Sequence, residues 1–407
     1  MTPTRSRPRV RREPDTMTTS GGFERTPRSA VRVEPTIDDT LRRKMERRGT
    51  VFHEQPRLDA VQDNLSQFLS GRLGGQFRID NVARLAGGAS KEQFVFDLDW
   101  ELDGQPRHDR MVLRMDPPAS MVETPRLREF EVLRMLDGAL PVPPVFWATE
   151  ESGELGAPSM ICGYVSGSAS ARDAVKTASG LGTTYGPRLR SVLGPQFVRH
   201  LAELHRFDWT AHRLESFERP RVGTTDAVDW RLAAWDRAWQ EDSFEAHPVI
   251  ALTRQWLWDR RPVVDHVSVV HGDYRNGNFL FDEESGTITA LLDWELTYLG
   301  DRHHDLAYAM MEGWGEHDSE TGEFYCSALV TRSDMIAEYE KVSGLPVDLE
   351  RLEYYTVVNM YWAAVALIGT GPRNAVERMT HLDAMQTFLG GLGAFYLDQL
   401  LTIVGKY

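Results

Sequence analysis

The residues with the clearest chemical potential lie late in the chain. Asp273 stands five residues before Asn278, the spacing at which phosphoryl-transfer enzymes place a proton-accepting aspartate and a magnesium-binding asparagine. The apolar runs 279–281 and 288–292 flank a turn-forming segment, which predicts a hairpin that returns Asp293 to the side of Asn278. Because Mg²⁺ takes oxygen ligands and completes its shell with waters and substrate phosphates, these two residues suffice as its protein ligands.

A glycine-rich turn lies between two predicted strands nearer the N-terminus. Strand-like runs occupy residues 77–85, 93–100 and 110–115. The loop 86–91 between the first two reads Ala-Gly-Gly-Ala-Ser-Lys, and glycines at such a turn let backbone amides approach phosphates closely. Gly87, Gly88 and Ser90 are therefore candidate phosphate contacts, although a Gly-Gly turn alone is most often only a turn.

Three motifs in fixed order carry a resemblance to a known family. They are HGDYRNGNFLF at 271–281, LLDWEL at 291–296 and LGDRHHDLAY at 299–308. Singly each is an ordinary turn or strand end, but the ordered set resembles the aminoglycoside phosphotransferase and choline kinase superfamily, and especially the kinase domains found alone or fused to acyl-CoA dehydrogenases. The resemblance covers about residues 50–400. It implies an α+β, bilobal, protein-kinase-like fold with an antiparallel sheet and a helix in the N-lobe and a larger, mostly helical C-lobe.

The resemblance also assigns roles to the catalytic residues. It implies that ATP lies between the lobes with its phosphates under Gly87 and Gly88, and that Asn278 and Asp293 hold Mg²⁺. Asp273 would orient the acceptor hydroxyl and take its proton. Arg275 occupies the place of a catalytic-loop lysine and would neutralise charge on the transferring phosphoryl group.

A cation and its partner are expected in the N-lobe. Arg114 lies in an apolar strand where protein kinases carry the lysine that binds the nucleotide phosphates. Arginine offers a planar, bidentate fork in place of a point charge, and the acyl-CoA-dehydrogenase-associated branch resembles this chain in using it. Glu129 matches the glutamate that holds this cation, with Glu131 as the alternative.

Further positions are assigned by resemblance alone. The backbone from Cys162 to Tyr164 would bind the nucleotide base at the hinge between the lobes. Asp305 would hydrogen-bond the backbone of the catalytic loop, with His271 as another supporting residue. His205 is interpreted as a structural residue that packs near this loop.

Composition divides the chain into an arm and two lobes. Residues 1–45 are rich in Arg, Pro, Thr and Ser with few large apolar side chains, which predicts a disordered basic arm. The arm lacks the apolar segment of a secretory signal, and Met17 is an alternative start. Residues 46–165 are assigned to a nucleotide-binding N-lobe and residues 166–407 to a C-lobe that carries the catalytic loop and the acceptor site.

Charge and cysteine content exclude several classes of function. The net charge is −14, and because the first 36 residues carry +4, the remainder carries −18. Nucleic-acid binding needs clustered cations, so no nucleic-acid partner is expected. No apolar run approaches the roughly 20 residues that span a bilayer, so no membrane span is expected. Two distant cysteines fit a reducing, cytoplasmic location.

The acceptor is expected to be a small molecule with a hydroxyl group. The dehydrogenase-associated resemblance favours a hydroxyacyl compound, whose anionic group would need a local basic pocket. Candidates for that pocket are Arg231, Arg237, Arg260 and Arg261. The alternatives are an aminoglycoside- or macrolide-type antibiotic, which would suit the acidic body, and a catalytically silent nucleotide-binding scaffold. The sequence leaves the choice between ATP and GTP and the oligomeric state open.

Overall fold

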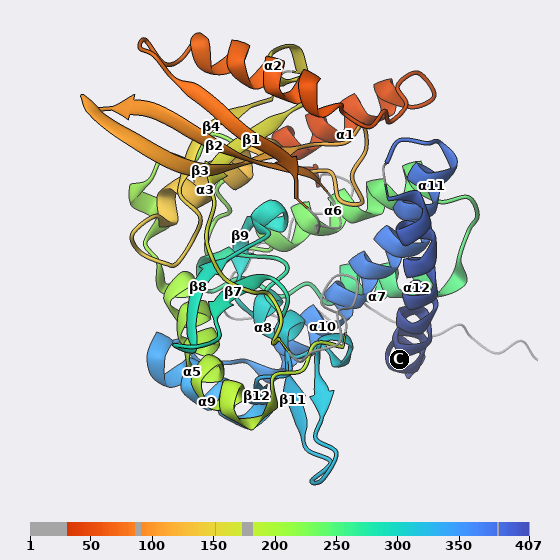
Figure 1. The fold of residues 1–407 in the computed structure, drawn as a ribbon. Helices are drawn as coiled ribbons and strands as arrows, with labels where there is room; N and C mark the ends of the chain where they lie inside the picture. Colours follow the sequence, from red (N-terminus) through yellow and green to blue (C-terminus); the bar gives the residue numbers. More distant parts are fainter. Residues whose placement is uncertain (1–30, 86–90, 151, 173–181, 381, 407) are drawn as a thin grey trace, which may run out of the picture.

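The computed structural model describes residues 31–85, 91–150, 152–172, 182–380 and 382–406. It has the expected α+β architecture of two lobes, with a sheet-containing N-lobe above a mostly helical C-lobe (Figure 1). The N-lobe helices are α2 (Leu58–Ser70), α3 (Arg126–Leu136) and α4 (Ser152–Leu155). Its strands are β1 (Arg78–Arg84), β2 (Glu92–Leu102), β3 (Gln105–Met115), β4 (Val145–Thr149) and β5 (Ser159–Gly163).

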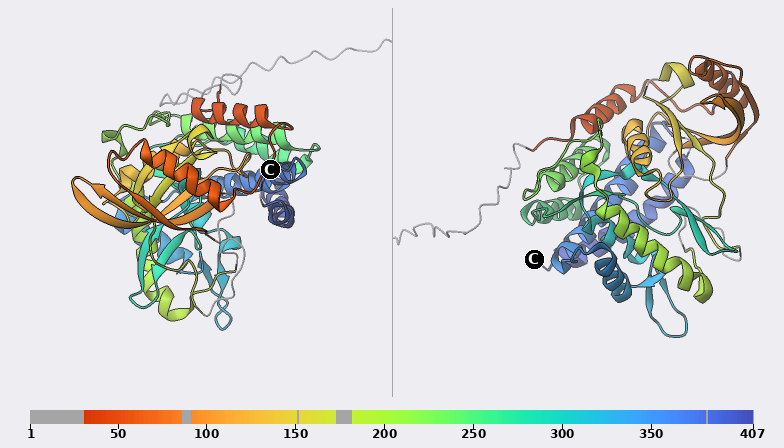
Figure 2. Two further views of the ribbon diagram at one scale, coloured as in Figure 1. Left: turned by 45° about the horizontal axis from the view of Figure 1, so that its top comes forward. Right: turned by 90° about the vertical axis from the view of Figure 1, so that its left-hand side faces the viewer.

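The N-lobe sheet is antiparallel with strand order β1-β2-β3-β5-β4. Strands β2 and β3 extend past their predicted ends and meet at Asp103 and Gly104, both with positive φ (53° and 76°). This Asp-Gly pair is the sequence that a two-residue hairpin turn prefers, because its twist matches that of the strands. Helix α2 lies over the sheet (Figure 2). Its buried residues Val61, Leu65, Phe68 and Leu69 form one core with Phe94, Phe96, Leu98, Met111 and Leu113.

The C-lobe is built mainly from helices around small two- and three-stranded sheets. Its helices are α5 (Gly186–Arg206), α6 (Asp226–Asp242), α7 (Pro248–Asp259), α8 (His303–Ala309), α9 (Arg332–Ser343), α10 (Leu349–Ala364), the π-helix η6 (Val365–Thr370), α11 (Gly371–Val376) and α12 (Asp383–Val404), with 3₁₀ turns η3 (Trp209–Ala211), η4 (Trp294–Leu296) and η5 (Glu312–Trp314). Its strands are β6 (Val267–Val270), β7 (Phe279–Asp282), β8 (Thr287–Leu291), β9 (Tyr298–Asp301), β10 (Glu316–His317), β11 (Phe324–Cys326) and β12 (Val330–Thr331).

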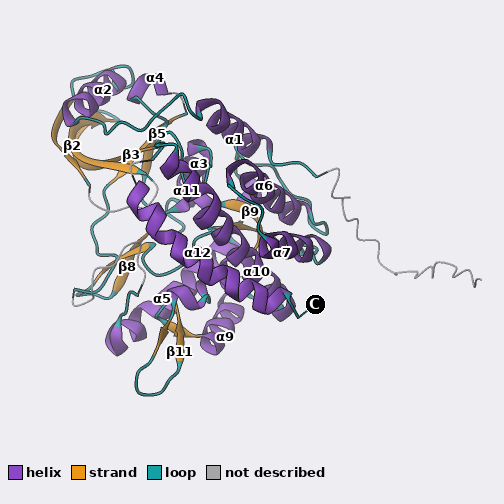
Figure 3. Cartoon of the chain, turned by 90° about the vertical axis from the view of Figure 1, so that its right-hand side faces the viewer, coloured by secondary structure: helices purple, strands orange, loops and turns teal. Residues whose placement is uncertain are grey.

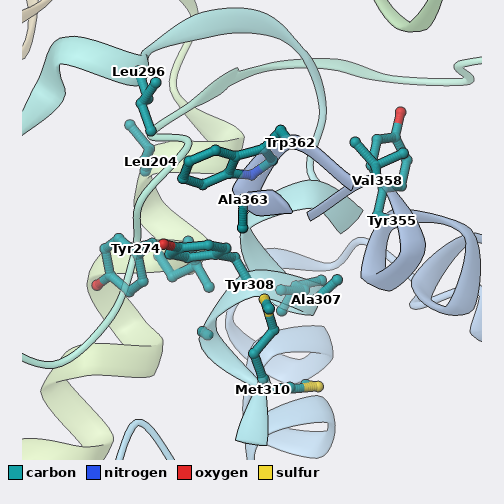
Figure 4. Packing of buried hydrophobic residues seen from close by; sticks show 14 of the residues in the cluster. Leu204, Tyr274, Leu296, Ala307, Tyr308, Met310, Tyr355, Val358, Trp362 and Ala363 are labelled. Atoms are coloured by element: carbon teal, nitrogen blue, oxygen red, sulfur yellow. The ribbon is translucent and has the colours of Figure 1, made fainter. Parts of the chain in front are cut away.

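An apolar core lies directly beneath the catalytic loop. Tyr274, Tyr308 and Trp362 are buried there together (Figure 4). The rings of Tyr308 and Trp362 stack with centroids 5.8 Å apart, and Tyr274 packs on Phe197 at 4.5 Å. Aromatic pairs of this kind contribute about 0.5–1.5 kcal/mol beyond their buried area. The loop that carries Asp273 therefore rests on a rigid base.

The prediction of disorder for residues 1–45 is wrong for its last part. Helix α1 (Pro35–Arg47) lies along α6 (Figure 1). Its Lys44 is buried, with Nζ 2.6 Å from Oδ2 of the fully buried Asp242. Asp242 also accepts a hydrogen bond from Thr370 at 2.6 Å. Because this anchor is distant in sequence, the local composition gave no sign of it. Residues 1–30 lie outside the described residues.

One described helix is long and apolar enough to cross a membrane by length and composition, which the sequence-based expectation of no span did not anticipate. It is Ala384–Val404 within α12, and 28% of its most apolar window is buried. Leu389, Tyr396, Leu400 and Val404 belong to the C-lobe core. The helix runs beside α10 and α11 (Figure 3), and this packing accounts for its inner apolar face.

Candidate active site

The catalytic loop begins with a turn that only glycine accommodates well. Strand β6 leads into His271 and Gly272, and Gly272 has φ of +85°. A Cβ atom at this position would lie 2.6 Å from the carbonyl oxygen of Leu296. Both the left-handed backbone and the close approach exclude a side chain. The turn sets the direction from which Asp273 leaves the strand.

Asp305 holds the start of this loop from below. Its fully buried carboxylate accepts hydrogen bonds from the amides of His271 (2.7 Å) and Gly272 (2.8 Å) and from Nε2 of His205 (3.1 Å). Burial alone would raise the pKa of Asp305, but the hydrogen bond from His205 and the nearby histidines keep it below the usual value. The ionised carboxylate therefore fixes the loop backbone, as the resemblance implied. His205 has the structural role expected of it.

His271 joins the catalytic loop to the segment that carries Asp293. Its Nε2 lies 2.9 Å from the carbonyl oxygen of Leu292, and the amide of Asp273 donates to its Nδ1 at 3.2 Å. These partners require a proton on Nε2 and none on Nδ1. Burial lowers the pKa of His271, which favours this neutral tautomer. The ring thus links two catalytic segments without carrying charge.

Asp273 is held on both oxygens by its neighbours in the loop. Nδ2 of Asn278 lies 2.6 Å from Oδ2 and 2.9 Å from the carbonyl oxygen of Asp273. Nε of Arg275 donates to Oδ1 at 3.0 Å, and the Arg275 guanidinium lies 4.1 Å over the Trp314 ring. Arg275 is buried and its guanidinium holds the Asp273 carboxylate in place. Its predicted effect on the charge of the transferring phosphoryl group stays a prediction.

The predicted hairpin brings Asp293 beside Asn278. Strands β7 and β8 pair antiparallel, and the amide of Leu292 donates to the carbonyl oxygen of Asn278 at 2.8 Å. Asp293 then takes a left-handed backbone conformation (φ 66°, ψ 57°). A positive φ is uncommon for a non-glycine residue and is tolerated best by Asn and Asp. The chain therefore changes direction at Asp293, the residue predicted to bind the metal ion.

The charges around Asp293 fit a cation. Burial, then the carboxylates of Glu295 and Asp273, raise the pKa of Asp293 to about 7, while Arg114 opposes the shift. Asn278 uses its amide nitrogen on Asp273, and its Oδ1 accepts no hydrogen bond within the described ranges. One carboxylate and one free amide oxygen are the hard donors that Mg²⁺ prefers. Asn278 and Asp293 would hold the ion, which would relieve the excess negative charge.

The expected cation and glutamate of the N-lobe are in contact. Arg114 lies on β3, the central strand of the sheet, and ion-pairs with the buried carboxylate of Glu129 on α3. Its Nη2 also lies 3.5 Å from Oδ1 of Asp293. Arg126 pairs with the second oxygen of Glu129 and with Asp116. Glu129 is therefore clamped by two guanidinium groups.

Glu131, the alternative partner for Arg114, points to the other lobe. It accepts hydrogen bonds from the amides of Glu215 and Ser216, both at 3.0 Å. On a helix, positions two apart face different directions. The geometry therefore favours Glu129 as the partner of Arg114.

The segment predicted to bind the nucleotide base lies at the end of β5. Cys162 is buried within β5, where it pairs with Val112 on one side and Val145 on the other. The amide of Gly163 donates to Pro144 (2.8 Å), and that of Tyr164 donates to Arg110 (2.9 Å). These two amide donors are thus occupied within the protein, and the contact of this backbone segment with the base stays a prediction. Gly87, Gly88 and Ser90 lie outside the described residues.

The predicted basic pocket does not form as one cluster of free cations. Arg237 ion-pairs with Glu241 at 2.6 Å, and Arg261 pairs with Asp229 at 2.7 Å. Arg260 packs over the Trp256 ring at 4.9 Å. Arg231 lies between the rings of Trp235 (5.0 Å) and Tyr298 (4.8 Å), and two of its nitrogen atoms are buried without a hydrogen-bond partner among the described residues.

Sequence reasoning missed several charged residues that surround the site. They are Lys91, Asp116, Arg126 and Glu295. Lys91 carried a weak signal, because lysine is scarce in this chain and this one follows the glycine-rich turn directly. Glu295 gave no signal, because its partner Lys91 lies far away in sequence. Asp116 and Arg126 pair with each other and Arg126 with Glu129, and sequence reasoning did not recognise Asp116 and Arg126 as part of the site.

Comparison with known proteins identifies relatives of this chain. Residues 81–339 match the model of the phosphotransferase enzyme family, APH. The mouse acyl-CoA dehydrogenase family member 10 is 24% identical over 80% of this chain and 30% of the relative. The Arabidopsis thaliana probable acyl-CoA dehydrogenase IBR3 is 25% identical over 76% of this chain and 38% of the relative. The chain thus spans about a third of the length of these curated relatives.

Solved structures show the same fold at low identity. A macrolide 2′-phosphotransferase type I has a TM-score of 0.51 and 19% identity, covering 82% of this chain and 97% of that one. A GDP and kanamycin complex of an APH(2″) enzyme has a TM-score of 0.51 and 16% identity, covering 85% and 99%. An APH(4)-Ia mutant bound to ADP and hygromycin B has a TM-score of 0.50 and 17% identity, covering 82% and 98%.

Proposed function

Because this chain belongs to the phosphotransferase enzyme family, we propose that it transfers the γ-phosphoryl group of ATP to a hydroxyl group of a small molecule, with Mg²⁺ as cofactor. The observation that carries the proposal is the assembly of Asp273, Asn278 and Asp293 at one place. Asn278 bonds Asp273 directly, and the backbone bond from Leu292 places Asp293 beside Asn278. A base and two magnesium ligands are the minimum that this chemistry requires.

In the proposed reaction Asp273 positions the acceptor hydroxyl and receives its proton. The hydroxyl oxygen forms a bond to the γ-phosphorus while the bond from that phosphorus to the bridging oxygen breaks, and ADP leaves. Arg275 fixes the carboxylate, and Arg114 faces the phosphates. Bound Mg²⁺ would supply neutralisation of phosphate charge. Because the transition state is loose, positioning and electrostatics supply most of the rate.

For the nucleotide base we infer a contact one residue beyond the predicted segment. The amide of Val165 follows the occupied amides of Gly163 and Tyr164, and within the described residues it donates no backbone hydrogen bond. A backbone donor at the end of β5 would pair with a ring nitrogen of the base. Backbone recognition of this kind supports ATP without excluding GTP.

For the acceptor we favour a hydroxyacyl compound over an aminoglycoside or macrolide. The curated relatives carry acyl-CoA dehydrogenase in their names, whereas the antibiotic-bound structures support the fold alone. Both cysteines are buried free thiols, in keeping with the cytoplasmic location that we propose.

The test is phosphorylated product in a panel of acceptors. Purified protein with Mg-ATP is incubated with hydroxyacyl-CoAs, free hydroxy acids, aminoglycosides, macrolides and choline-like alcohols, and products are detected by mass spectrometry. Asp273→Ala serves as the control. A product that requires Asp273 supports the proposal and identifies the acceptor class. A product formed equally by Asp273→Ala would contradict it, and magnesium-nucleotide binding without any product would favour a silent scaffold.

A further inference from the structure

Lys91 is a buried ammonium group directly before β2. Its Nζ lies 3.1 Å from Oδ1 of Asp116 and 3.4 Å from Oε2 of Glu295, and it donates to Oγ of Ser120 at 2.8 Å. The ammonium thus makes one hydrogen bond and two ion pairs within the protein. Burial would lower the pKa of Lys91, but Asp116 and Glu295 hold it above the usual value. The side chain is therefore a buried cation that is engaged by groups of the protein itself.

The Lys91–Glu295 pair connects the two lobes at the segment that carries Asp293. Lys91 directly precedes β2 of the N-lobe sheet, and Glu295 lies in the C-lobe turn η4, two residues after Asp293. The contact between Arg114 and Asp293, at 3.5 Å, joins the same two parts of the molecule. Each carboxylate of the Asp-Trp-Glu turn therefore faces its own N-lobe cation. If one of these two ion pairs is broken, an unpaired charge remains next to the other ion pair.

These two pairs are the ends of a series of ion pairs beside the site. Its members, in order, are Glu295, Lys91, Asp116, Arg126, Glu129, Arg114 and Asp293. The series contains three cations and four carboxylates, so one negative charge is uncompensated. Asp293 is its most exposed member, with 32% of its side chain accessible, whereas Glu295 has 11%. The excess charge is thus presented at the proposed magnesium ligand.

We propose that Lys91 is a positioning residue for the magnesium-nucleotide site, a role that rests on the proposed function. By pairing with Glu295, Lys91 prevents this second carboxylate from binding the magnesium ion. Asp293 is then the carboxylate that faces the ion. Lys91 acts through Glu295 and Asp116, since its ammonium group is buried and ion-paired with these two carboxylates. Residues that orient metal ligands typically change metal affinity or activity about 10–100-fold when replaced.

The test is a double-mutant cycle read by equilibrium binding. The four proteins are wild type, Lys91→Met, Glu295→Gln and the double variant, and binding of the non-hydrolysable analogue AMP-PNP is measured calorimetrically with Mg²⁺ and with EDTA. We expect each single variant to weaken magnesium-dependent binding about 10–100-fold. The double variant should recover most of this loss, because it leaves neither charge unpaired. Binding in EDTA should be equal in all four proteins.

Lys91→Arg is the matched control, because it keeps the charge and should bind within a few-fold of wild type. Thermal unfolding checks that each variant is folded. If Lys91→Met does not fold, the test uses Glu295→Gln, because in that variant Lys91 keeps its contacts with Asp116 and Ser120. Wild-type protein that binds no magnesium nucleotide would overturn the proposed function and this role together. Normal wild-type binding with an unchanged Lys91→Met would overturn the role of Lys91 alone. A double variant as weak as the weaker single variant would also overturn it.

Discussion

Asp305→Asn removes the support of the catalytic loop with the smallest change in shape. The carboxylate of Asp305 accepts three hydrogen bonds, two of them from the backbone amides of His271 and Gly272. Asparagine has one acceptor oxygen, and its NH₂ group would face at least one of these N–H donors. One bond is therefore lost, and a buried donor is left without a partner.

The expected cost follows from these contacts. A hydrogen bond to a charged group contributes about 1.5–3 kcal/mol, and an unpaired buried donor costs about 1–3 kcal/mol, so we expect the free energy of unfolding to fall by about 2.5–6 kcal/mol. The amide of Gly272 directly precedes Asp273. Because a displacement of about 1 Å in a catalytic group can cost about 100-fold in rate, turnover should fall by this order.

The assay compares Asp305→Asn with a carboxylate of equal burial elsewhere. Asp229 on α6 accepts bonds from Thr225 and Arg261, both at 2.7 Å, and it does not contact the catalytic loop. Asp229→Asn should lower the thermal midpoint comparably while preserving kcat at a temperature where both variants are folded. If Asp305→Asn kept kcat within twofold of wild type under these conditions, the assigned role of Asp305 would be refuted.

Three further predictions concern pH and the turns of the site. Magnesium-dependent nucleotide affinity should fall about tenfold between pH 8 and pH 6, because the pKa of Asp293 is about 7 and protons compete with the ion; titration of Asp293→Asn should show no such dependence. Gly272→Ala should abolish turnover, since its Cβ would meet the Leu296 carbonyl oxygen. Wild-type kinetics of this variant would contradict the conclusion that the turn requires glycine. The free energy of unfolding should fall as pH drops from about 6.5 towards 4. Burial lowers the pKa of His271 and lowers that of His304 to about 4, so in this range the unfolded chain binds protons that the folded chain does not. Urea midpoints that are equal at pH 7.5 and pH 5 would contradict this.

Local patterns predicted the catalytic segment well. The spacing of Asp273 and Asn278 and the hairpin that returns Asp293 depend on residues close together in sequence, and the structure brings them together. The two-lobed fold followed from the order of the motifs. Strand β3 was predicted too short because residues 105–110 are polar and largely exposed, so they carry no apolar signal although the Asp-Gly turn pairs them with β2.

Long-range charge pairs could not be predicted in the same way. Helix α1 depends on Lys44 meeting Asp242, and the series of ion pairs beside the site depends on Lys91 meeting Glu295. In each case a buried charge is stable only because a distant partner neutralises it. A sequence read locally shows these residues as ordinary surface charges.

The most direct test of the central claim separates the base from the metal ligand. Calorimetric binding of AMP-PNP with Mg²⁺ and with EDTA should be measured for wild type, Asp273→Asn and Asp293→Asn. We predict that Asp273→Asn binds the magnesium nucleotide nearly as tightly as wild type, whereas Asp293→Asn loses the gain that magnesium provides. Equal magnesium-dependent binding by wild type and Asp293→Asn would contradict the assignment of Asp293 as metal ligand and with it the proposed active site.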